Sequence, residues 1–181
     1  MQKKIILVLT ILATVIATYW LINYVGMRGF LFAWSLNFML MMFVFKFTET
    51  LKAEYTSPYY KEKNWEKTGK IYEYLGINVF RKLLVLIGWE KLNKKANPVN
   101  KNQESLTHLE YRTKQSEFGH LLVFVIVLGF NIVVIFNFGL TESVWLLVLN
   151  ILLNVYPILL QRYNRPRLNR AIKLHKIRTS Q

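Results

Sequence analysis

The 181-residue sequence contains no cysteine and no aspartate. Without cysteine the chain can form no disulfide, no zinc–thiolate site and no cysteine-held iron–sulfur cluster, and it has no thiol nucleophile. Because aspartate is missing as well, every acidic side chain is one of the 10 glutamates. Functions that need a cysteine side chain of the protein are therefore excluded, and any catalytic carboxylate side chain must belong to a glutamate.

Charged residues are missing from four long stretches of the chain. A helix needs about 20 predominantly apolar residues to cross the hydrocarbon core of a bilayer. A soluble or nucleic-acid-binding domain would not segregate its charges in this way, so we expect no nucleic-acid partner despite the net charge of +14. The sequence predicts an all-α integral membrane protein forming a single membrane domain over residues 1–181. The four transmembrane helices are expected at about 5–25, 29–47, 118–140 and 143–161.

The first apolar stretch could also be a cleaved signal peptide. Lys3 and Lys4 precede an apolar run that contains the small residues Ala13 and Ala17, as in secretory signals. The apolar run continues through residues 19–22, beyond any plausible cleavage point. We therefore expect an uncleaved helix, with cleavage as the alternative.

Basic residues predict which side of the membrane each loop occupies. The segment between spans two and three and the tail after residue 161 hold most of the Lys and Arg, whereas the two short turns hold only Arg28 and Glu142. Lys and Arg favour the cytoplasmic side. We expect a multi-pass protein of the cell membrane with both termini in the cytoplasm. The sequence does not predict an oligomeric state.

The segment 48–117 is expected at the cytoplasmic face. Residues 71–92 have apolar side chains at helical spacing, which predicts one amphipathic helix in the membrane interface between spans two and three. A small soluble domain is the alternative. The polar residues 93–106 predict an exposed loop, and Thr107 with Glu110 resembles a capping box that would start the helix of span three.

Glu117 and His120 are candidate catalytic residues at the start of span three. Residues three apart share a helix face, and a carboxylate beside an imidazole is a common arrangement for a general base. Solvated charges at a membrane boundary are the alternative interpretation. A metal site is not expected, because the di-iron proteins that use a Glu-x-x-His pair need two such pairs and two further glutamates.

Span four and the tail offer candidate substrate-binding residues. Asn154 and Gln161 lie on one helical face with Asn150 and Pro157, where buried amides usually bond across helices. Arg162, Arg165 and Arg167 could pair with phosphate oxygens, and Pro166 is expected in the first turn of a new basic helix. Binding of anionic lipids by this basic tail at 162–181 is the alternative.

Three stretches resemble one enzyme family. Residues 154–168, with Gln161-Arg162-Tyr163-Asn164-Arg165-Pro166-Arg167 at their centre, are similar to the C-terminal signature of the glycosyl-4,4'-diaponeurosporenoate acyltransferase family. Thr113-Lys114-Gln115-Ser116-Glu117-Phe118-Gly119-His120 and Glu66-Lys67-Thr68-Gly69-Lys70 resemble two further elements of that family. The resemblance covers roughly residues 60–170.

The resemblance implies an O-acyltransferase in the biosynthesis of staphyloxanthin-type carotenoids. Such an enzyme moves a fatty acyl group to a sugar hydroxyl of a glycosylated C30 carotenoid, a membrane glycolipid. The acyl thioester donor would be acyl-CoA or acyl carrier protein, and no other cofactor is expected. On this hypothesis His120, oriented by Glu117, removes the hydroxyl proton, and Asn154, Gln161 and Lys114 join the three arginines, Tyr163 and Asn164 in binding substrate.

Two other functions stay open on the sequence. One is a non-catalytic membrane protein that binds anionic lipid through its basic tail. The other is a different four-span enzyme, such as one that handles glutathione or sterols, since small helical bundles host many activities.

The predicted sidedness can be measured with reporter fusions. A reporter that is active only in the cytoplasm should be active when fused after Gln181 and inactive when inserted in the turn at Met27. The reverse pattern, or activity at both sites, would contradict the predicted orientation.

Overall fold

A computed structural model describes residues 1–96 and 102–179, and every element assigned within them is helical. Four helices in this part of the chain are long and apolar enough to cross a membrane, at Gln2–Val25, Gly29–Leu51, Gln103–Phe138 and Leu140–Thr179. The all-α fold with four candidate membrane spans is therefore confirmed, and the protein is a membrane protein.

The first two long helices are α1 (Gln2–Val25) and α2 (Gly29–Leu51), and the third is α6 (Gln103–Phe138). The fourth consists of α7 (Leu140–Asn150), one π-helical turn η3 (Ile151–Val155) and α8 (Tyr156–Thr179). Between α2 and α6 lie η1 (Pro58–Tyr60), η2 (Asn64–Gly69), α3 (Ile71–Tyr74), α4 (Ile77–Leu86) and α5 (Trp89–Ala96).

The chain divides into two compact units. Unit 1 comprises Met1–Glu54 and Phe118–Pro157, and unit 2 comprises Tyr55–Glu117 and Ile158–Gln181. Unit 1 therefore contains α1, α2, α7 and most of α6. Unit 2 contains the short helices, the first part of α6 and most of α8.

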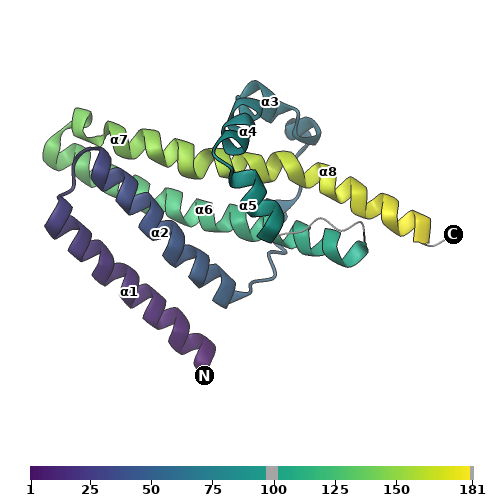
Figure 1. The fold of residues 1–181 in the computed structure, drawn as a ribbon, viewed down its shortest axis with the longest axis horizontal. Coiled ribbons are helices and arrows are strands. Elements are labelled where there is room, and N and C mark those ends of the chain that lie inside the picture. The colour runs from purple at the N-terminus through teal and green to yellow at the C-terminus, as the bar shows by residue number, and fades with distance from the viewer. Residues whose placement is uncertain (97–101, 180–181) are drawn as a thin grey trace. The chain divides into compact units, whose positions relative to one another are not determined.

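Unit 1 is a helical bundle with an apolar core. Helices α1 and α2 form an antiparallel pair joined by a short turn (Figure 1), in which Gly26 and Gly29 both have positive φ. Side chains of α2, α6 and α7 at helical spacing fill the core. Its buried members are Phe32, Ala33, Leu36, Leu40, Val44, Val123, Val127, Val134, Leu146 and Leu149.

Amide side chains connect α6 to α7 within this apolar bundle. The Asn131 side chain donates to the backbone oxygen of Ser143 at 2.9 Å, and the Asn150 side chain donates to that of Phe124 at 3.1 Å. Hydrogen bonds between helices favour association in a medium where water cannot compete. These two bonds fix the register of α6 against α7.

The turn between α6 and α7 lies earlier than the sequence predicted. Gly139, with φ of 90°, separates the helices, and Thr141 and Glu142 belong to the first turn of α7 rather than to the connection. Glycine adopts this backbone conformation without a steric penalty. A glutamate in a first helical turn is also favoured by the helix dipole.

The start of the third long helix also differs from the prediction. Asn102 rather than Thr107 caps it, since the Asn102 side-chain oxygen accepts from the Ser105 backbone N–H at 3.0 Å. Thr107 is inside α6 and donates to the Gln103 carbonyl. The predicted loop at 93–106 is helical in α5 up to Ala96 and in α6 from Gln103, and residues 97–101 of that prediction lie outside the described residues.

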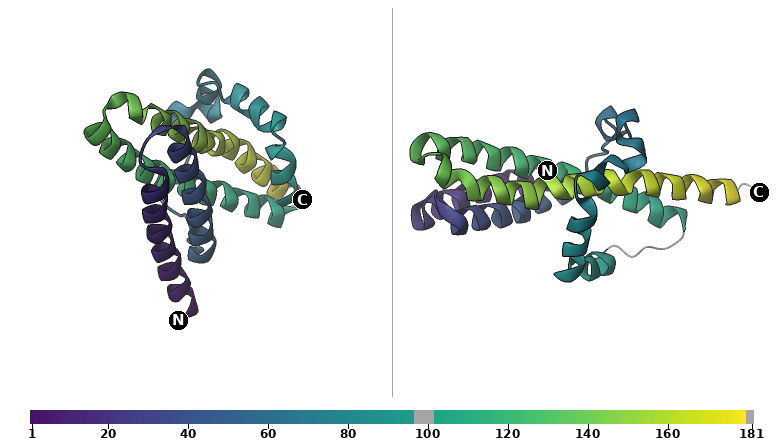
Figure 2. Two further views of the ribbon diagram at one scale, coloured as in Figure 1. Left: turned by 60° about the vertical axis from the view of Figure 1, so that its left-hand side comes forward. Right: turned by 90° about the horizontal axis from the view of Figure 1, so that it is seen from above.

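The prediction of a single amphipathic helix over residues 71–92 is wrong. The segment instead forms the separate helices α3, α4 and α5, and the teal ribbon changes direction along it (Figure 2). Gly76 and Gly88, with φ of 78° and 76°, stand at the two breaks. A left-handed residue ends an α-helix, and apolar periodicity does not reveal where such a residue stands. In α4, Ile77 and Phe80 are buried whereas Val79 and Leu86 are exposed.

Two prolines affect the fourth long helix differently. Pro157 follows the π-helical turn Ile151–Val155. Because proline has no N–H, it removes the α-helical partner of the Leu153 carbonyl, and a π-helical turn shifts the hydrogen-bond register at such a point. Pro166 does not start a new helix as predicted, because α8 runs through it from Tyr156 to Thr179.

Gly69 packs against α8 within unit 2. Its φ is 88°, and a Cβ there would lie 3.0 Å from the Tyr163 backbone oxygen and 3.3 Å from Nη1 of Arg167. Both the backbone conformation and the close approach therefore require glycine.

We expect Gly69→Ala to destabilise unit 2 by about 1–3 kcal/mol, because strain and a backbone clash are combined. Gly88→Ala is the matched control, since Gly88 has a similar φ of 76° and nothing within 4 Å of its Cβ position. Thermal unfolding in detergent measures both variants. Equal destabilisation would show that the contact with α8 contributes nothing.

Candidate active site and its glutamate–arginine cluster

A buried carboxylate, Glu117, is bound by two arginines of α8. Its side chain has no exposed surface. Arg162 donates from Nε to Glu117 Oε1 at 2.8 Å, and Arg165 donates from Nη2 to Glu117 Oε2. A buried ion pair is favourable only when its partners are well aligned and further hydrogen bonds satisfy the remaining donors.

The remaining guanidinium nitrogens of the two arginines are also satisfied. Arg162 donates from Nη1 to Glu66 Oε1 at 2.7 Å and from Nη2 to the Tyr59 carbonyl at 3.2 Å. Arg165 donates from Nη1 to the Tyr60 carbonyl at 3.2 Å and from Nε to Thr113 Oγ1 at 3.3 Å. All three nitrogens of each guanidinium thus donate hydrogen bonds to other protein groups. Both arginines therefore connect η1 and the first part of α6 to α8.

Aromatic rings cover the same two guanidinium groups. The Arg162 guanidinium carbon lies 4.5 Å from the centroid of the Tyr59 ring, and that of Arg165 lies 5.6 Å from the Tyr60 ring. Cation–π contacts of this kind stabilise a desolvated arginine. Burial raises the pKa of Tyr60 to about 12, so its hydroxyl stays neutral at physiological pH.

Glu66 completes the cluster from η2. Its Oε1 accepts from the Tyr72 hydroxyl at 2.6 Å, and its Oε2 accepts from the Lys63 backbone N–H at 2.7 Å. Burial by itself would raise the pKa of Glu66, but the hydrogen bonds from Tyr72, Lys63 and Arg162 outweigh it and hold the pKa below its usual value. The ionised carboxylate therefore stabilises the fold at neutral pH, and this contribution is lost as the pH falls through the lowered pKa.

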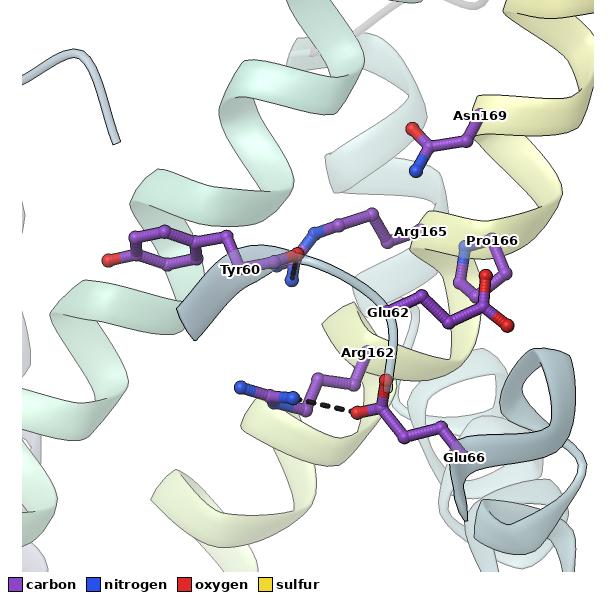
Figure 3. A pocket seen from close by; sticks show the side chains of 7 residues that line it. All are labelled: Tyr60, Glu62, Glu66, Arg162, Arg165, Pro166 and Asn169. Carbon is purple, nitrogen blue, oxygen red and sulfur yellow. Dashed lines mark hydrogen bonds and ion pairs between the residues drawn. The ribbon is translucent and has the colours of Figure 1, made fainter. Parts of the chain in front are cut away.

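A small pocket adjoins the cluster in unit 2. Figure 3 shows Glu66 and Arg162 pointing toward one another, with Arg165, Pro166 and Asn169 following along α8. Its volume of about 10 Å³ leaves room for about one water molecule. This pocket is too small for an acyl group or a sugar.

The other predicted substrate-binding residues of unit 2 lie at varied depths. Tyr163 is buried, and its hydroxyl donates to Glu73 at 3.2 Å. The guanidinium carbon of Arg167 lies 3.7 Å from the centroid of the Tyr163 ring. Lys114 pairs with Glu110 at 2.6 Å, as the i,i+4 spacing favours. Gln161 and Asn164 are partly buried on α8.

A second polar group lies in unit 1, around His120. Its Nδ1 is 3.4 Å from Oδ1 of Asn154, which lies in the π-helical turn. The Asn154 side chain donates to Oδ1 of Asn37 at 2.8 Å and to Oδ1 of Asn150 at 2.9 Å. Asn37, Asn150 and Asn154 have no exposed surface.

The sequence prediction of Glu117 with His120 as an acid–base pair stays a prediction. Both oxygens of Glu117 accept from arginine in unit 2, and the side-chain partner described for His120 is Asn154 in unit 1. No group of three or more His or Glu side chains that could hold a metal ion occurs among residues 1–96 and 102–179.

Sequence reasoning missed several residues of these two polar groups. Asn37 was detectable, since it is the only amide in the uncharged stretch 29–45 and polar groups inside a membrane are costly unless bonded. The roles of Tyr59 and Tyr60 were not detectable, because their partners Arg162 and Arg165 are distant in sequence.

The three stretches that resembled one enzyme family meet in unit 2. Glu66 and Gly69 of the stretch 66–70 contact Arg162 and the Tyr163 backbone of the stretch 154–168. Thr113 of the stretch 113–120 accepts from Arg165. A family model described as CrtO, glycosyl-4,4'-diaponeurosporenoate acyltransferase, matches residues 56–174. The chain belongs to this acyltransferase family. The resemblance inferred from the sequence is confirmed.

The family match covers all of the glutamate–arginine cluster and His120, whereas α1 and α2 lie outside it. Comparison with curated proteins and with solved structures gives no match. The name of the glycosyl-4,4'-diaponeurosporenoate acyltransferase family implies acyl transfer in carotenoid glycolipid biosynthesis.

Removing one ion-pair partner from the glutamate–arginine cluster should greatly lower the stability of this acyltransferase. Arg165→Met should destabilise the protein by about 3–5 kcal/mol, because it leaves Glu117 with less compensation for its buried charge. Thermal unfolding in detergent measures the effect.

Arg167→Met is the control for this prediction. The Arg167–Glu73 pair is exposed, with 46% and 41% of the side chains accessible, and exposed pairs contribute about 0–1 kcal/mol. Losses of equal size in the two variants would contradict a special role for the buried pair.

Proposed function

We propose that this protein transfers a fatty acyl group from an acyl thioester to a sugar hydroxyl of a glycosylated C30 carotenoid in the membrane. Membership of the glycosyl-4,4'-diaponeurosporenoate acyltransferase family over residues 56–174 is the observation that carries the proposal. The four apolar helices agree with an acceptor that resides in a bilayer.

In this proposal His120 is the general base. Asn154 supports this role of His120. Both N–H groups of its side chain donate to other amide oxygens, so that its own oxygen faces His120 Nδ1. A neutral imidazole that donates from Nδ1 carries its lone pair on Nε2. Nε2 would remove the sugar hydroxyl proton as the hydroxyl oxygen attacks the thioester carbonyl, and the thiol leaves protonated.

The charged part of the donor is assigned to the far end of α8. Arg170, Lys173, Lys176 and Arg178 are exposed there, and the sequence contains no acidic residue after Glu142. Phosphates of coenzyme A or the acidic surface of an acyl carrier protein suit such a surface. Arg162 and Arg165 have a structural role in this proposal, because all their nitrogens hold protein groups.

We also propose that both termini and unit 2 face the cytoplasm, with α4 in the interface. Val79, Leu83 and Leu86 of α4 are exposed apolar residues, while Arg81 and Lys82 are exposed on the same helix. An amphipathic helix of this kind binds at the headgroup boundary, where basic side chains meet anionic lipids.

Lipid mass spectrometry of cells with and without the protein tests the function. Cells that make the glycosylated carotenoid should gain a product heavier by one fatty acyl group only when the protein is present. His120→Ala should lower product formation by about 10²- to 10⁴-fold, the usual contribution of a general base, without loss of folded protein.

His108→Ala is the matched control, because His108 is exposed on the same helix, and it should leave product formation unchanged. Full activity of His120→Ala would remove this residue from the mechanism. Salt-sensitive binding to anionic vesicles, with no acylated product in any lipid class, would favour the alternative of a non-catalytic lipid-binding protein.

A further inference from the structure

An apolar groove lies within unit 1, between α1, α2 and α6. It has a volume of about 590 Å³ and is lined almost entirely by apolar atoms. Its walls include Ile11 and Val15 of α1, Phe43 and Phe47 of α2, and Leu122 and Ile126 of α6. Sites for small molecules usually have volumes of about 300–1,000 Å³, so the groove is large enough for one lipid tail.

The three threonines of the groove do not offer free donors to a polar ligand. The Thr10, Thr14 and Thr18 hydroxyls donate to the carbonyls four residues earlier, at 2.7–2.8 Å. Each hydroxyl proton is therefore used within α1, in the usual way for threonine in a membrane helix. The groove suits a hydrocarbon rather than a sugar or a phosphate.

The length of the groove distinguishes the two hydrocarbon parts of the proposed substrates. On α1 it extends from Thr10 to Ile22, which is roughly 18 Å at about 1.5 Å per residue. An extended alkyl chain advances roughly 1.25 Å per carbon, given a C–C bond of about 1.52 Å. About 14 carbons of a fatty acyl chain therefore fit, whereas the rigid polyene of a C30 carotenoid is longer than the groove.

We propose that this groove binds the fatty acyl chain of the donor and sets the chain length that is transferred. The inference rests on the proposed acyltransferase function. It adds a binding site that the family match does not cover, because α1 and α2, which form most of the groove, lie outside residues 56–174. Residues Met1–Leu51 are thereby assigned to substrate selection as well as to membrane insertion.

Blocking part of the groove tests the proposal. Thr14→Trp, in the full chain expressed in membranes, would fill the groove four residues from Thr10. Wild type and variant are supplied with an equimolar mixture of acyl thioesters of about 4 to 18 carbons, and the acylated products are measured by mass spectrometry. An excluded methylene changes selectivity by roughly 10- to 200-fold, so the ratio of long to short products should fall at least about tenfold.

Leu12→Trp is the matched control. Leu12 is 52% exposed on the same helix and is not among the groove residues, so its variant should retain the wild-type product profile. Extraction of both variants as monodisperse protein in detergent controls for folding.

Three outcomes would overturn the proposal. The first is that Thr14→Trp changes neither the acyl profile of the products nor the KM for the carotenoid acceptor. The second is that Leu12→Trp changes the acyl profile as Thr14→Trp does. The last is that Thr14→Trp alters the KM for the acceptor and leaves the acyl profile unchanged. The first would mean that the groove holds only bulk lipid, and the last that it holds the polyene. If wild-type protein forms no acylated glycolipid at all, the proposed function fails instead, which is a distinguishable result.

Discussion

The ion pairs between Glu117 and the two arginines of α8 are the constraint on which unit 2 depends. A carboxylate without exposed surface is costly in free energy unless each oxygen has a strong partner. Arg162 and Arg165 supply those partners, and their remaining nitrogens connect to Glu66, Thr113 and the backbone of η1. One desolvated charge cluster thus specifies how three segments, far apart in the sequence, meet in unit 2.

Unit 1 also buries polar side chains, but they are amides rather than charged groups. Asn37, Asn150 and Asn154 share hydrogen bonds inside an apolar bundle, and His120 joins them through Asn154. In hydrocarbon an unbonded amide costs several kcal/mol, so a set that bonds within itself is tolerated and fixes its own geometry. In the proposed mechanism, the Asn154 oxygen would keep the proton of His120 on Nδ1.

Irregular backbone accompanies both groups. The π-helical turn Ile151–Val155 contains Asn154 and precedes Pro157, and Lys67, Thr68 and Gly69 all have positive φ beside the glutamate–arginine cluster. A threonine in this conformation is strained, and such strain persists only where the surroundings determine it. In unit 2 the packing of Gly69 on α8 provides that determination.

The sequence alone determined the all-helical fold, the four candidate spans and the family, because uncharged stretches of this length and the run Gln161–Arg167 are local patterns. The pairing of Lys114 with Glu110 is local as well, since residues at i,i+4 share a helix face. Only the tertiary structure decided that Arg162 and Arg165 hold Glu117 and Glu66. An arginine that binds a phosphate and one that binds a buried carboxylate look the same in a sequence. Which of the two an arginine binds depends on whether the fold brings a carboxylate within about 3 Å of it. The breaks at Gly76 and Gly88 and the capping by Asn102 also depended on packing and backbone geometry that apolar periodicity does not encode.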